Sequence, residues 1–137
     1  MFIDIHVHVC REPSAPRWGK QPTATAEQLL ERYDRIGVER GVVLPIVSPE
    51  CTVLPQANEE ILDACRRYPR RFVPFCNIDP RALTNSWDAP LGELLRYYKG
   101  KGCKGIGEVM PNLPLNHPLV ENLLRHVQDV GFPLTFH

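Results

Sequence analysis

The sequence lacks the features that would assign it to several common protein classes. It carries no net charge, because 16 basic residues balance 16 acidic ones, and this argues against a basic groove for nucleic acid. No apolar run approaches the roughly 20 residues that cross a bilayer. The first residues contain no basic segment followed by an apolar core, so we predict no signal peptide. We expect a cytoplasmic protein without a nucleic-acid or membrane partner.

The cysteines do not form a recognisable framework either. They are odd in number, widely spaced and without a Cys-x-x-Cys pair: Cys10, Cys51, Cys65, Cys76 and Cys103. This pattern argues against a disulfide scaffold and against a zinc site built from thiolates. We expect the thiols to be reduced and buried as small apolar groups.

The sequence does contain a regular alternation of strand and helix patterns. Strand-like segments cover residues 2–9, 40–47, 71–78, 103–109 and 132–137, with helical patterns between them. The strands start about 30 to 40 residues apart, which is typical of a (β/α)8 TIM barrel of about 250 residues. We therefore predict an α/β fold in which residues 1–137 form one incomplete domain, the N-terminal part of a TIM barrel with about five βα units.

A complete five-stranded, doubly wound sheet is the alternative for a chain of 137 residues. That fold predicts a glycine-rich phosphate-binding loop after the first strand. The sequence has "HVHVCREP" at this point, which contains no glycine. The partial barrel is therefore the preferred prediction.

The first strand carries two histidines at alternate positions, in "FIDIHVHV". Alternate side chains of a strand share a face, so Asp4, His6 and His8 point one way. The other face is apolar, and we expect its residues to pack under the helices: Ile3, Ile5, Val7 and Val9. Residues two apart lie about 7 Å apart at Cα, so both imidazoles can lean onto one divalent ion, with zinc expected. The alternative is a pair of core histidines that are satisfied by hydrogen bonds.

These segments resemble the amidohydrolase superfamily, and within it the amidohydrolase-2 branch of metal-dependent hydrolases and decarboxylases. The likeness rests on "FIDIHVHV", "GVERGVVLP" and "ANEEILDACRRYPRRFVPFCNIDP". It runs over the whole chain but covers only the first five strands of that family's barrel. It implies an enzyme with one or two divalent ions at the carboxyl ends of the strands and a small-molecule substrate.

The resemblance implies four metal ligands in this sequence. His6 and His8 match the ligands of the first strand, and His137, at the end of "FPLTFH", matches the histidine that ends the fifth strand. Glu108, in "GIGEVM", holds the fourth-strand position where other members carry a lysine or a glutamate. A carboxylate there could bridge two ions, although many members of the branch lack it.

Glu108 also has a structural alternative, an ion pair with Lys104 or Arg81. The strand pattern does not decide its face, because Glu108 shares a pleat with Ile106, and Gly105 and Gly107 lie on the opposite pleat. We expect these glycines to leave room for helix packing.

Further ligands of the family have no counterpart here. A histidine that ends the sixth strand, and the aspartate of the eighth strand that serves as acid and base, would lie beyond residue 137. The catalytic residue is therefore unassigned, and we expect the sequence to be part of a longer chain or a truncated product.

Three more residues are candidate substrate contacts. Arg11 and Trp18 lie in the loop after the first strand, which we expect to cover the mouth of the barrel. Cationic side chains there favour a carboxylate-bearing substrate. Asp79, in "NIDP", follows the third strand, where it either caps the next turn or faces the substrate.

The expected activity is hydrolysis of an amide, ester or lactone bond through a metal-activated water. Decarboxylation uses the same kind of site. A nuclease of the TatD type is a further alternative, because such enzymes share the histidine pair, a "GIGE"-like glutamate and a fifth-strand histidine. The last alternative is a non-catalytic half-barrel that pairs with a partner, or with a second copy of itself, through its open edges.

Overall fold

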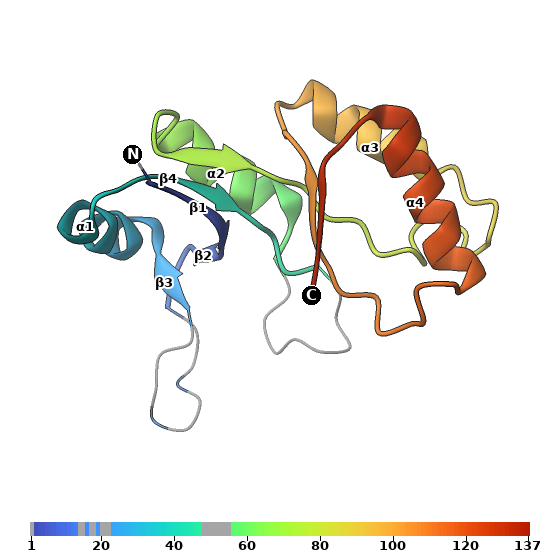
Figure 1. The fold of residues 1–137 in the computed structure, drawn as a ribbon, viewed down its shortest axis with the longest axis horizontal. Coiled ribbons are helices and arrows are strands. Elements are labelled where there is room, and N and C mark those ends of the chain that lie inside the picture. Colours follow the sequence, from blue (N-terminus) through green and yellow to red (C-terminus); the bar gives the residue numbers. More distant parts are fainter. Residues whose placement is uncertain (1, 14–15, 17–18, 20–22, 48–55) are drawn as a thin grey trace.

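The computed structural model describes residues 2–13, 16, 19, 23–47 and 56–137. Its elements in chain order are β1 (Phe2–Val7), β2 (Val9–Cys10), β3 (Ala24–Thr25), α1 (Ala26–Ile36), β4 (Val38–Val43), α2 (Asn58–Arg67), β5 (Phe72–Pro74), α3 (Leu91–Gly100), β6 (Ile106–Val109), α4 (Pro118–Val130) and β7 (Leu134–Phe136). Figure 1 shows α1 and α2 beside β1 and β4, and α3 and α4 beside β6 and β7.

The predicted strands lie side by side in the order of the sequence. β1 pairs with β4 and β4 with β5, all parallel. Cys76, just beyond β5, forms a parallel bridge to Ile106 in β6, and β6 pairs in parallel with β7. This order confirms an α/β fold of parallel βα units. The described strands form one three-stranded sheet and two two-stranded sheets, and they do not close into a barrel.

Local signals in the sequence account for the helix boundaries. Thr25 and Gln28 form a capping box at the start of α1, and Gly37 ends the helix in the left-handed conformation. His117 caps α4, where its side chain accepts a hydrogen bond from the Leu119 amide. None of the helices in the described residues has the length and apolar character needed to cross a membrane.

The first strand differs from the prediction in two ways. It ends at Val7, and residues 9–10 form the separate strand β2, which pairs with β3. Ile3 and Ile5 are 51% and 69% exposed, so the prediction that they pack under the helices is wrong, whereas Val9 is buried in a core cluster and Val7 packs against it. The reason is position: β1 pairs only with β4 among the described strands, and α1 packs against β4 and β3 instead.

Two apolar clusters lie between the sheet and the helices. One joins α1, α2, β4 and β5 around residues such as Val43 and Ile61. The other joins α3, α4 and β6 around Leu95, Ile106 and Leu123, each of which is fully buried. Both clusters pack the helices against the strands and hold the strands in place.

Replacing Leu95 by alanine is expected to lower the free energy of unfolding by about 2–5 kcal/mol, because it leaves a cavity in the second cluster. The control is Ile5→Ala on the exposed edge strand, for which we expect a change within about 0.5 kcal/mol. Urea denaturation followed by circular dichroism measures both. Equal losses in the two variants would contradict this account of the core.

Candidate metal centre

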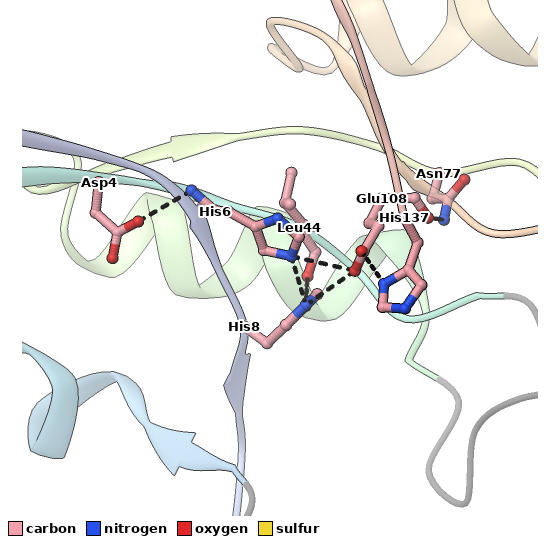
Figure 2. A network of polar contacts seen from close by, with 7 residues as sticks. All are labelled: Asp4, His6, His8, Leu44, Asn77, Glu108 and His137. Atoms are coloured by element: carbon pink, nitrogen blue, oxygen red, sulfur yellow. Dashed lines mark hydrogen bonds and ion pairs between the residues drawn. The ribbon is translucent and has the colours of Figure 1, made fainter.

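Three side chains from opposite ends of the sequence meet at the carboxyl ends of the strands (Figure 2). His6 lies in β1, His8 directly follows it, and Glu108 lies near the end of β6. The His6 and His8 Nε2 atoms are 3.3 Å apart, and they lie 3.1 Å and 3.4 Å from Glu108 Oε2. Two imidazole nitrogens and one carboxylate oxygen thus form a nearly equilateral triangle.

The size of this triangle fits a divalent metal ion. Ligand atoms bonded at 2.0–2.1 Å in a tetrahedral zinc site are separated by about 3.3 Å. The three measured separations lie close to that value. Imidazole and carboxylate are also the donor types that zinc and manganese accept. The residues are therefore suited to hold such an ion.

Leu44 determines which nitrogen of His8 is available to a metal. His8 Nδ1 lies 2.8 Å from the carbonyl oxygen of Leu44, at the end of β4. A carbonyl oxygen only accepts, so in a neutral ring Nδ1 carries the proton and Nε2 carries the lone pair. This is the common arrangement of metal-binding histidines, whose other ring nitrogen is held by a carbonyl or a carboxylate.

Asp4 connects β1 to the first helix. Its Oδ1 accepts a hydrogen bond of 3.0 Å from the backbone amide of His6, and its Oδ2 accepts one of 2.8 Å from the hydroxyl of Tyr33 in α1. Burial, together with the hydrogen bond to this carboxylate, raises the pKa of Tyr33 well above its usual range. The hydroxyl therefore stays protonated and keeps donating to Asp4, which restrains the backbone at His6.

An irregularity in β6 turns Glu108 toward the histidines. Ile106 and Val109, three residues apart, both pack in the core under α3 and α4, and the pairing of β6 with β7 shifts between them. Gly107 lies at this shift, with φ +152°. Glu108 consequently faces away from the core although it shares a pleat with Ile106, and its oxygens contact histidines instead of Lys104 or Arg81.

The fourth predicted ligand lies on the other side of the same carboxylate. His137 follows β7, and its Nδ1 is in close contact with Glu108 Oε1. Glu108 therefore directs one oxygen at the two histidines of the first strand and the other oxygen at His137 (Figure 2). The side chain of Glu108 is only 10% exposed, so its charge is shielded from bulk water.

A cleft of about 720 Å³ opens beside these residues and contains His8, Glu108 and His137. This volume lies within the range of small-molecule sites, about 300–1,000 Å³. Much of its wall is apolar and comes from Ile46, Val109, Met110, Leu113, Leu115 and Phe136. The arrangement offers a polar end and an apolar wall to one ligand.

The residues predicted to contact substrate lie elsewhere or outside the described part. Arg11 lines a different pocket, between the loop after β2 and α2, together with Glu60 and Arg67. Trp18 lies outside the described residues. The Asp79 carboxylate accepts from the backbone amide of Arg81 at 2.8 Å and pairs with its guanidinium at 3.0 Å, so it stabilises the turn after β5.

Three residues near the site were missed from the sequence. Leu44 acts through its backbone carbonyl, which no side-chain pattern reveals. Tyr33 reads as one of the apolar positions of α1, and its hydroxyl partner is 29 residues away. Asn77, next to Asp79 in "CNIDP", is 2% exposed and donates to the backbone oxygen of Glu108. An asparagine within a strand-like segment was the one signal available.

Comparison with known proteins supports the fold. No family model matches the sequence, and no curated protein matches it. Among solved structures, it resembles a probable 2-pyrone-4,6-dicarboxylic acid hydrolase from Acinetobacter baumannii with citric acid bound, at 21% identity and a TM-score of 0.63, over 99% of this chain and 49% of that chain. It resembles a 5-carboxyvanillate decarboxylase from Novosphingobium aromaticivorans with bound manganese, at 22% identity and a TM-score of 0.58, over 80% of this chain and 34% of that chain.

A third structure identifies the architecture. It is an uncharacterized TIM-barrel protein from Bordetella bronchiseptica, with 16% identity and a TM-score of 0.68, over 98% of this chain and 54% of that chain. The chain thus spans about half the length of the matched structures or less, and identities this low establish the fold alone. The predicted fold is confirmed at this level: the chain has the fold of about half of a TIM barrel, and the solved structures that it resembles include one described as an amidohydrolase II, at 14% identity and a TM-score of 0.67.

Proposed function

We propose that the chain carries part of the active site of a metal-dependent hydrolase that acts on a small organic substrate. The observation that supports this best is the triangle of His6 Nε2, His8 Nε2 and Glu108 Oε2, which has the size of a metal-ligand set. Zinc is the ion expected from the ligand types, and manganese is the ion bound to the matched decarboxylase. His137 is proposed as a fourth ligand, because its Nδ1 contacts Oε1, the second carboxylate oxygen of Glu108.

The proposed division of labour follows from the positions of the side chains. His6, His8 and Glu108 would hold the ion, and a divalent ion at such a site activates water and polarises a carbonyl or carboxylate. The Leu44 carbonyl selects the tautomer of the neutral His8 ring that carries its lone pair on Nε2, the nitrogen that faces Glu108. The apolar wall formed by Leu113, Leu115 and Phe136 would hold the organic part of the substrate and exclude water.

Decarboxylation is the second candidate. The match to a decarboxylase that binds manganese and a substituted benzoic acid supports it. The cleft also suits an aromatic ring, because its wall carries Met110, Leu115 and Phe136. In both cases the substrate would be a small organic acid, since the matched hydrolase is described for a pyrone dicarboxylate.

The first test of the proposal is whether the chain binds a divalent metal ion. The metal-free chain is titrated with Zn²⁺ and with Mn²⁺ in a calorimeter, alongside Glu108→Gln. The wild-type chain is expected to bind at least one ion stoichiometrically, and Glu108→Gln is expected to weaken binding because an amide is a poorer ligand for these ions. Glu93→Gln, at an exposed position in α3, is the control and should bind like the wild type.

Product analysis then separates the two activities. The metal-loaded protein is incubated with a lactone carboxylic acid and with a carboxylated phenol. Ring opening of the lactone supports the hydrolase, and release of CO₂ from the phenol supports the decarboxylase. A wild-type chain that binds neither ion would end the proposal for both activities.

A further inference from the structure

We propose that Asn77 is a positioning residue for Glu108 and that Asn58 holds Asn77 in place. The inference rests on the proposed metal centre, and it adds how the carboxylate is aimed. The Asn77 amide donates from Nδ2 to the backbone carbonyl of Glu108 over 2.5 Å. Both asparagines are buried, with exposures of 2% and 8%.

The two asparagines form one continuous hydrogen-bonded chain. Asn58, the first residue of α2, accepts from the Asn77 amide with its Oδ1 at 2.7 Å and donates from Nδ2 to the Asn77 carbonyl at 2.9 Å. Asn77 Oδ1 accepts from the Ile78 amide at 2.9 Å. Each of these buried side-chain groups therefore has a hydrogen-bond partner, and these bonds hold both amide side chains in a single orientation.

The network lies next to the isolated bridge that joins the chain after β5 to β6. At this bridge the Cys76 amide donates to the Gly105 carbonyl, and the Cys76 carbonyl accepts from the Gly107 amide at 2.8 Å. Directly after Gly107 the strand departs from regular pairing, and this departure turns Glu108 toward the histidines. Beyond the bridge, the Asn77 side chain donates to the Glu108 carbonyl and fixes the peptide group from which the carboxylate projects (Figure 2).

Loss of the Asn77 hydrogen bond is expected to lower the affinity for metal more than it lowers the stability of the fold. Without this hydrogen bond the peptide group of Glu108 could shift and carry the carboxylate away from the histidines, and affinity would fall even if the protein remained folded. Loss of an outer partner of a metal ligand typically lowers affinity by about 10- to 100-fold. We expect Asn77→Ala to fall within this range for Zn²⁺, and Asn58→Ala to shift affinity in the same direction by a smaller factor.

Asn122 provides a matched control. It is also buried, at 4% exposure, and its amide donates to a backbone carbonyl, that of Ala89, at 2.9 Å. Asn122→Ala therefore removes the same chemical group from a similar environment on α4. It should lower stability like Asn77→Ala and leave metal affinity unchanged. Urea denaturation and zinc titration of the same samples separate the two effects.

A readout that needs no metal keeps the inference testable. The ring-nitrogen NMR shifts of His6 and His137 report their contacts with the Glu108 carboxylate in the metal-free protein. Asn77→Ala is expected to change both shifts, and Asn122→Ala neither. If Asn77→Ala does not fold, Asn58→Ala carries the same test.

Suppose that the wild type binds metal, and that the Asn77 and Asn58 variants keep both its affinity and its histidine shifts. This result would overturn the positioning inference and leave the proposed function standing. A wild-type chain that binds no ion would instead end the proposed function. The two failures are therefore distinguishable.

Discussion

Replacing His8 by alanine is expected to reduce affinity for Zn²⁺ by more than about 100-fold, beyond the range typical of losing an outer partner. The variant loses one corner of the ligand triangle, and it leaves the Leu44 carbonyl without its imidazole donor. An ion present at 100 times its dissociation constant stabilises the folded state by about 2.7 kcal/mol. This stabilisation should be present in the wild type and absent in His8→Ala when thermal unfolding is measured with and without Zn²⁺.

His117→Ala is the matched control for this experiment. His117 is a histidine of the same chain, but its Nδ1 caps α4 by accepting from the Leu119 amide at 3.3 Å. Its loss should lower the free energy of unfolding by about 0.5–2 kcal/mol and leave zinc affinity unchanged. A His8→Ala variant that still gains stability from Zn²⁺ like the wild type would remove His8 from the site.

Replacing Gly107 by alanine is expected to destabilise the fold and to impair metal binding together. An added Cβ would lie 1.9 Å from Thr135 Oγ1 in β7 and 3.1 Å from the Thr135 carbonyl oxygen. The backbone at Gly107 also has φ +152°, which an alanine adopts only with strain. Overpacking alone costs about 1–3 kcal/mol. Because Glu108 is the next residue, the displacement needed to relieve the clash would move the carboxylate.

Gly100→Ala controls for the glycine substitution itself. Gly100 ends α3 and has no atom within 4 Å of an added Cβ, so the substitution should be neutral or stabilising by up to about 1 kcal/mol. Thr135→Ala should partly restore the Gly107→Ala variant, because it removes the hydroxyl that causes the closest contact. Free energies of unfolding and zinc titrations of the single and double variants measure this coupling. Purely additive effects would show that the clash is not the cause.

Local signals in the sequence account for several features of the fold. Thr25 with Gln28, Gly37 and Gly131 mark helix ends through caps that involve neighbouring residues only. The alternation of strands and helices predicted parallel pairing, because neighbouring parallel strands need a long crossover connection, which is usually a helix. The exposure of Ile5 was mispredicted for the opposite reason: whether a strand is covered depends on its neighbours in space.

Some features of the candidate site could also be predicted from local sequence, and others could not. The two-residue period of a strand predicted that His6 and His8 share a face. Their Nε2 atoms do meet, although β1 ends at Val7 and its pairing is irregular between Asp4 and Val7. The side of the sheet on which Glu108 lies did not follow, because the irregularity at Gly107 reverses the alternation between Ile106 and Val109. Arg81, a predicted partner of Glu108, pairs with Asp79 instead. The assignment of His137 and Glu108 as ligands stays a prediction.

The sequence by itself determined the order of the elements, the ends of the helices and the histidine pair, because each depends on residues only a few positions apart. Only the tertiary structure decided that Glu108 meets His6 across 102 positions, that Leu44 selects the nitrogen of His8, and that Asn77 holds the peptide of Glu108. The physical reason is that these contacts depend on the register between neighbouring strands and on a local break in that register. Neither is encoded in the periodicity of a single segment.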